Sequence, residues 1–136
     1  MLPQQKEALS ALISALVFTV LLTIIRPLAG GFSSEIVFIA ILVFTVSLWI
    51  SREVVGFRSR NLDEREWMIR YQAGLIAAHF LGAVFMVGAA VLYLHHKETM
   101  LVPMEQVALL AFYGWMSLYV SWAAAILVMY RRGSAL

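Results

Sequence analysis

The stretch from residue 71 to residue 94, YQAGLIAAHFLGAVFMVGAAVLYL, contains no Asp, Glu, Lys or Arg, and it decides the fold class. A helix that crosses a membrane needs about 20 predominantly apolar residues, because the hydrocarbon core is ~30 Å thick. Arg70 precedes the stretch and His95-His96-Lys97 follows it, so polar side chains stand at both ends. The sequence therefore predicts a transmembrane helix here.

Similar apolar blocks occupy most of the remaining chain. The protein has 136 residues, of which 62% are hydrophobic and only 13% charged, with a mean hydropathy of +0.87. A soluble domain has far more charged surface. We therefore expect one integral membrane domain over residues 1–136, an all-α four-helix transmembrane bundle in which sequence neighbours pack antiparallel. The predicted spans are about 8–25, 36–54, 71–94 and 106–130.

Lysine and arginine are distributed unevenly between the two sides of this bundle. Eight of the ten lie at the N-terminus, in the second loop or at the C-terminus, which share one side. They are Lys6, Arg52, Arg58, Arg60, Arg65, Arg70, Arg131 and Arg132. Only Arg26 and Lys97 lie on the other side. Since cytoplasmic loops are enriched in these residues, we expect a multi-pass protein of the prokaryotic cytoplasmic (inner) membrane with both termini inside.

A dense group of charges precedes the stretch at 71–94. Asn61 and Glu64 have the spacing of a capping box, which predicts a helix start near Leu62. The third helix would then extend ~15 Å into the cytoplasm before it meets hydrocarbon. Glu66 and Arg70 have the spacing of an ion pair within one helix.

These local roles do not require so many charges in so short a segment. We therefore expect the segment 58–70 to be a cytoplasmic docking surface as well. Its candidate interaction residues are Asp63, Glu64, Arg65, Glu66 and Arg70.

The same region resembles a group of small, uncharacterised prokaryotic membrane proteins with four predicted helices. In that group a D-E-R motif lies between helices two and three and precedes a charged stretch and an alanine-rich span. The resemblance implies the four-helix architecture but no activity, substrate or cofactor. The matching residues are Asp63-Glu64-Arg65, Ile69-Arg70, Ala73-Gly74 and Ala77-Ala78.

His79 is the only strongly ionisable side chain inside a predicted span, and such residues are functional hypotheses by default. It lies ~9 Å below the inner interface. Two interpretations stay open: a neutral imidazole that hydrogen-bonds across helices, or a contact to a proton or ligand. His95 and His96 lie at the opposite membrane face, so a haem would need His79 from two copies. Small polar residues at similar depth would complete a polar layer, consisting of Ser14, Ser47, His79 and Ser121.

Aromatic residues share one face of the fourth span, and small residues share another. Aromatic side chains deep in a span can line a site for a quinone, a pigment or a lipid tail, or they can simply pack. If the small face packs inside the bundle, the aromatic face looks outward. The candidate residues for a hydrophobic ligand are His79, Trp115, Tyr119 and Trp122.

Small residues also recur every four positions in the third span, at Gly74, Ala78 and Gly82, and in the first span, at Ala11 and Ala15. Such faces let helices approach closely. They can close the bundle internally or join two chains. We expect a homo-oligomer or a larger membrane-protein complex, with the lipid bilayer as the surrounding medium.

No nucleophile–base pair, metal-ligand cluster or phosphate loop is evident, and the chain has no cysteine. We therefore expect no enzymatic activity, no metal and no cofactor. Nucleic-acid binding has no support, because the arginines lie beside membrane spans. The expected function is a non-catalytic accessory or scaffold subunit that docks through the segment 58–70. The alternative is a small transporter or a protein that binds a hydrophobic ligand (quinone, pigment or haem) through the His79 layer and the aromatic residues.

Overall fold

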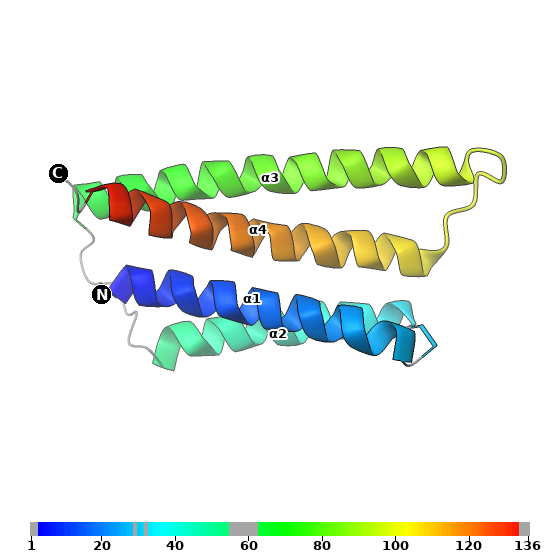
Figure 1. Ribbon diagram of the computed structural model, residues 1–136, viewed down its shortest axis with the longest axis horizontal. Coiled ribbons are helices and arrows are strands. Elements are labelled where there is room, and N and C mark those ends of the chain that lie inside the picture. Colours follow the sequence, from blue (N-terminus) through cyan, green and yellow to red (C-terminus); the bar gives the residue numbers. More distant parts are fainter. Residues whose placement is uncertain (1–2, 29, 32, 55–62, 134–136) are drawn as a thin grey trace.

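A computed structural model shows four α-helices in the part of the chain that it describes (Figure 1). The described residues are 3–28, 30–31, 33–54 and 63–133, with the side chains of residues 3, 34, 51–54 and 133 excepted. The helices alternate in direction, so α1 begins and α4 ends at the same end of the bundle (Figure 1). The prediction of an all-α, four-helix chain is confirmed. The helices are α1 (Pro3–Leu28), α2 (Ser34–Val54), α3 (Glu64–His96) and α4 (Met104–Gly133).

Within the described ranges three helices, α1, α3 and α4, are long and apolar enough to cross a membrane. In α2 the apolar part with described side chains, Glu35–Ile50, is shorter. At ~1.5 Å per residue α3 is about 50 Å long, which exceeds a hydrocarbon core of ~30 Å. The described residues therefore form a helical bundle in which three helices have the length and composition of membrane spans. Insertion into a membrane, and α2 as a fourth span, stay predictions.

α4 lies between the other helices and packs against all three (Figure 1). α3 packs along one side of α4, whereas α1 and α2 pack against α4 and against each other. Among the described residues the backbones of α1 and α2 do not come close to that of α3. The predicted packing of sequence neighbours is therefore right for α1 with α2 and for α3 with α4. It is wrong for α2 with α3, because α4 occupies the place between them.

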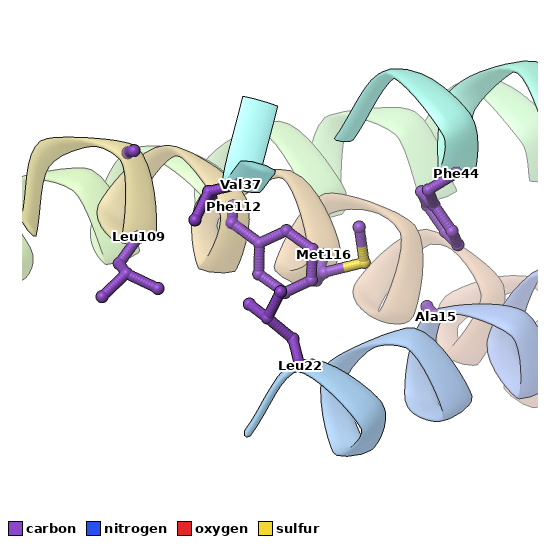
Figure 2. Close-up of a cluster of buried hydrophobic side chains, with 8 residues drawn as sticks. Ala15, Leu22, Val37, Phe44, Leu109, Phe112 and Met116 are labelled. Atoms are coloured by element: carbon purple, nitrogen blue, oxygen red, sulfur yellow. The ribbon is translucent and has the colours of Figure 1, made fainter. Parts of the chain in front are cut away.

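Two apolar clusters hold the helices together. The first joins α1, α2 and α4, and the rings of Phe18 and Tyr119 meet the Phe44 ring edge-on at centroid distances of 5.1 and 5.3 Å. Its buried members are Ala15, Leu22, Val37, Phe44, Ala108, Leu109, Phe112 and Met116 (Figure 2). The second joins α1, α3 and α4 nearer the end where α1 begins. Its buried members are Ala8, Ala11, Ile69, Ala73, Ala123, Ile126 and Tyr130.

The aromatic face of α4 points inward, toward α1 and α2. Trp115 donates a hydrogen bond from Nε1 to Thr45 Oγ1 of α2 at 3.0 Å, and Tyr119 packs on Phe44. On another side of α4, the Phe85 ring of α3 lies against Gly114. The expectation that the aromatic face looks outward is therefore wrong, because α4 has neighbours on two sides and uses both faces.

The contact at Gly114 yields a test of this packing. A Cβ at Gly114 would lie 2.7 Å from an atom of the Phe85 ring. We expect Gly114→Val to destabilise the bundle by ~1–3 kcal/mol, which is the usual cost of overpacking. Unfolding in mixed detergent micelles, followed by tryptophan fluorescence, measures this loss.

Gly74→Val, unfolded at a dilution in detergent at which the chain is monomeric, is the matched control, because a Cβ at Gly74 meets nothing within 4 Å. It introduces the same residue into the middle of a helix but without a clash. Equal losses of stability in the two variants would contradict the register of α3 on α4.

Candidate functional site

The charged start of α3 follows Asp63, which is the N-cap residue and has an extended backbone. Asp63 has φ −59° and ψ 148° and makes no capping hydrogen bond with its side chain, so the helix begins at Glu64. Asn61 and Leu62, the predicted cap and start, lie outside the described residues, as do Arg58 and Arg60. From Glu64 the helix extends ~10 Å before it reaches Tyr71, rather than the predicted ~15 Å.

Four of the five predicted interaction residues lie at the start of α3, and the fifth, Arg70, lies farther along the helix. Asp63, Glu64 and Arg65 are exposed, and Glu66 is half-buried. Arg70, by contrast, reaches across to α1. The docking residues that remain open to a partner are therefore the three at the very start of the helix.

Arg70 forms an ion pair that holds α1 against α3. Its Nη2 donates to Glu7 Oε2 at 2.7 Å, and the two side chains are only 17% and 13% exposed. The spacing in the sequence predicts Glu66 as the ion-pair partner of Arg70 and does not identify Glu7. A signal existed, since Glu7 and Arg70 carry opposite charges just before apolar blocks that begin at the same end of the predicted bundle.

Two buried polar groups lie near the same end of the bundle. Gln4 and Tyr130 are each 7% exposed. Within the described part of the chain, Gln4 Oε1 and the Tyr130 hydroxyl have no hydrogen-bond partner. Buried polar atoms are usually satisfied by protein or by an ordered water, so this end of the bundle suits bound water.

A second ion pair joins α1 to α4 at the other end. Arg26 donates from Nε and Nη2 to Glu105 Oε1 at 3.2 and 2.9 Å, with the side chains 41% and 36% exposed. Glu7 and Arg26 are ~28 Å apart along α1. This separation matches the thickness of a hydrocarbon core, so the two ion pairs mark the ends of the apolar region.

His79 lies on the outside of the bundle. Ala77 is buried against α4, and His79 follows two positions later, about 200° around the helix. The imidazole is exposed, and Nδ1 lies 2.7 Å from the carbonyl oxygen of Leu75 in the preceding turn. Because a carbonyl oxygen only accepts, Nδ1 carries the proton and Nε2 of the neutral ring is an acceptor.

The predicted polar layer does not assemble around His79 in a single chain. The Ser47 hydroxyl donates to Phe44 O at 2.8 Å and the Ser121 hydroxyl to Ser117 O at 2.6 Å, each within its own helix. Ser14 is half-buried on α1. His79 lies on the side of α3 away from the buried Ala77, and α3 makes no close backbone contact with α1 or α2 among the described residues.

The candidates for a hydrophobic ligand are likewise separated. Trp115, Tyr119 and Trp122 are half-buried and pack against the two apolar clusters. His79 lies across α3 from them. These four residues therefore do not form one site within a single chain.

The histidines at the far end of α3 have local roles. His96 Nε2 lies 2.7 Å from Gln106 Oε1 of α4, and the rings of His95 and His96 meet edge-on at a centroid distance of 4.8 Å. Within the described ranges no three His, Asp or Glu side chains gather as metal ligands would. Of the three histidines, only His79 lies in the apolar middle of α3, and within the described residues its Nε2 has no hydrogen-bond partner.

No protein-family model, curated protein or solved structure matches the chain. The resemblance to the D-E-R group of membrane proteins stays a prediction. What the protein does is therefore inferred from its own geometry.

The two ion pairs give a matched test of that geometry. Arg70→Met leaves Glu7 buried without its guanidinium, which typically costs ~3–5 kcal/mol. Arg26→Met breaks a more exposed pair, so we expect a loss below ~1 kcal/mol. Unfolding in mixed micelles measures both variants.

Adding Glu7→Leu to Arg70→Met should recover much of the lost stability, because no charge is then left buried. Equal effects of Arg70→Met and Arg26→Met would show that the Glu7–Arg70 pair is not buried as described.

Proposed function

We propose that the protein is a non-catalytic subunit of a membrane assembly that associates with other transmembrane helices through α3. One observation carries this proposal: over its 33 residues, α3 buries only Ile69, Ala73 and Ala77. A helix that packs closely against α4 alone and fully buries so few side chains has most of its surface available for another partner.

A row of small residues on α3 supports the proposal. Gly74, Ala78 and Gly82 are exposed, and a Cβ built on Gly74 or Gly82 meets nothing within 4 Å. These residues therefore do not close the bundle, although they lie only ~100° around the helix from the buried alanines. Rows with this spacing allow two helices in a membrane to approach closely.

His79 supports association for a different reason. Ionisable residues inside membrane spans almost always face protein or water rather than lipid. In a single chain His79 faces outward among apolar side chains. A second helix on this side of α3 would remove the imidazole from lipid.

The start of α3 extends the same surface beyond the membrane. Trp67 and Tyr71 are exposed and stack with a centroid distance of 5.4 Å and an interplanar angle of 6°, as expected for aromatic residues at headgroup depth. Asp63, Glu64 and Arg65 precede these aromatic residues in the sequence and lie farther from the apolar part of α3. The distribution of Lys and Arg favours the cytoplasm of a prokaryotic cell for this end.

The alternative, a transporter or ligand-binding protein with an internal His79 layer, has less support. A transport pathway through the bundle would need His79 to face the other helices. Its position on the outside of α3 favours a role between chains instead.

Site-specific photo-cross-linking in intact membranes tests this proposal. Met86 continues the row Gly74–Ala78–Gly82 by another four residues and is 74% exposed. A photoreactive residue at position 86 should form an adduct with a protein. Val87 is the matched control, since it is 63% exposed at nearly the same depth but ~100° around the helix. Equal yields of protein adduct at positions 86 and 87 would contradict the proposal.

The charged start of α3 gives a second test. The double change Asp63→Lys with Glu64→Lys should lower the yield of the adduct at position 86 several-fold, whereas the stability of the purified bundle should fall only by the ~0.3–1 kcal/mol per charge that a cation costs at a helix N-terminus. The opposite end provides the control, with Glu98→Lys expected to have no effect. An unchanged yield in the double variant would remove this segment from the docking surface.

A further inference from the structure

Like α3, α2 has a side that no other helix covers in the described part of the chain. Its buried residues, Val37 and Phe44, belong to the cluster shared with α1 and α4. Large side chains on the side turned away from that cluster are 44–64% exposed and recur at intervals of four, four and three residues. We call them the α2 ridge, which consists of Phe38, Leu42, Val46 and Trp49.

The α2 ridge contains a hydrogen-bond donor without an acceptor. Trp49 is 63% exposed, and among the described residues no group accepts a hydrogen bond from its Nε1. An indole nitrogen only donates, and a tryptophan removed from water usually finds an acceptor for it. Trp115 follows this rule, since its Nε1 donates to Thr45 of α2. In apolar surroundings Trp49 therefore calls for an acceptor that the described residues of its own chain do not supply.

His79 on α3 has the complementary deficiency. Its Nδ1 donates to Leu75 O, which leaves Nε2 as an acceptor, and among the described residues no group donates to Nε2. A symmetric pair of copies that met His79 to His79 would oppose two acceptors and satisfy neither. A contact between His79 of one copy and Trp49 of another satisfies both.

Trp49 and His79 lie at nearly the same depth in the bundle. Thr45 of α2 and Phe85 of α3 contact adjacent residues of α4, at positions 115 and 114, so they share one level. From that level toward the end where α1 begins, Trp49 is four residues along α2 and His79 is six residues along α3. At ~1.5 Å per residue, the two side chains therefore differ in depth by only ~3 Å.

The sizes of the side chains are complementary as well. Ala78 and Gly82 adjoin His79 on the outer side of α3, and a Cβ on Gly82 would meet nothing within 4 Å. Large side chains of one helix pack into the space that small residues leave on another, as the α2 ridge would here. Because α2 and α3 run in opposite directions, copies inserted the same way up meet as antiparallel helices.

The length of α2 also favours a protein neighbour over lipid. Its apolar block between Glu35 and Arg52 is shorter than the ~20 residues that a membrane span needs. Association with other helices is one of the ways in which a short apolar stretch is accommodated in a bilayer.

We infer that copies of this chain join head to tail, with the α2 ridge of one copy on the outer side of α3 in the next and with Trp49 Nε1 donating to His79 Nε2 between them. α2 and α3 lie on opposite sides of α4, so each copy offers one surface of each kind (Figure 1). Such contacts repeat from copy to copy and close into a ring when the rotation permits. The inference rests on the proposed association through α3 and names a second copy as the partner.

Pairs of introduced cysteines test the inference, because the chain has none of its own. Full-length copies with Leu42→Cys and differently tagged full-length copies with Met86→Cys are produced together, and their membranes are oxidised. The two positions are 64% and 74% exposed and lie within ~3 Å of the same depth. We expect a disulfide that joins the two tags, and a ladder of trimers and larger species from a chain that carries both changes.

Val43→Cys in place of Leu42→Cys is the matched control, because Val43 is 50% exposed but ~100° around α2. It should give a several-fold lower yield. Equal yields from Leu42→Cys and Val43→Cys, or dimers of Met86→Cys alone without a ladder from the doubly changed chain, would overturn the inference. If position 86 forms an adduct with protein but not with position 42, the inference fails and the proposed association through α3 stands.

The hydrogen bond is tested by energy transfer between dye-labelled copies in bilayers of increasing lipid dilution. Trp49→Phe keeps an aromatic ring but removes the donor, so it should weaken association ~3- to 10-fold. His79→Leu should weaken it to a similar extent, and Trp49→Phe should then have no additional effect. Ser10→Ala, which removes an exposed hydroxyl on α1, is the control and should leave association unchanged. Additive losses from Trp49→Phe and His79→Leu would show that the two side chains do not meet.

Discussion

The position of α4 between α3 on one side and α1 and α2 on the other determines the rest of the structure. In a membrane, lipid is as apolar as the protein interior, so close packing and a few polar contacts decide which helix faces associate. α4 has one face where Gly114 accepts the Phe85 ring and another where Phe112 and Met116 meet α1 and α2. Because α4 has neighbours on both faces, α3 lies at the edge of the bundle, and among the described residues only the backbone of α4 comes close to it.

The sequence predicts the helices well, because charges and polar residues interrupt the apolar blocks close to their observed ends. It does not predict how each helix is rotated. In α3, Ala73 and Ala77 are buried whereas Gly74 and Ala78 are open, although both rows have the same spacing and similar size. Hydropathy cannot separate them, since the side of α3 turned away from α4 is as apolar as the side that faces α4.

The polar contacts were harder still to predict, because they depend on which helices meet. Arg70 has an acidic residue at the right spacing in its own helix, yet it reaches Glu7, and that choice requires the starts of α1 and α3 to lie at the same end of the bundle. The direction of His79 depends in the same way on the rotation of α3. The geometry therefore shifts the candidate site from the interior of the bundle, and from the charged segment that contains Arg70, to the outer side of α3.

The central claim is that protein, rather than lipid, covers the outer side of α3 in the native membrane. The chain has no cysteine, so single cysteines for spin labels can be introduced one at a time. The most direct measurement is the accessibility of such labels to oxygen dissolved in the bilayer, at positions 75, 78 and 86 and at positions 76, 80 and 87. We expect low accessibility at the first three positions and high accessibility at the second three. Equally high accessibility at all six would show that lipid surrounds this side of α3 and would contradict the claim.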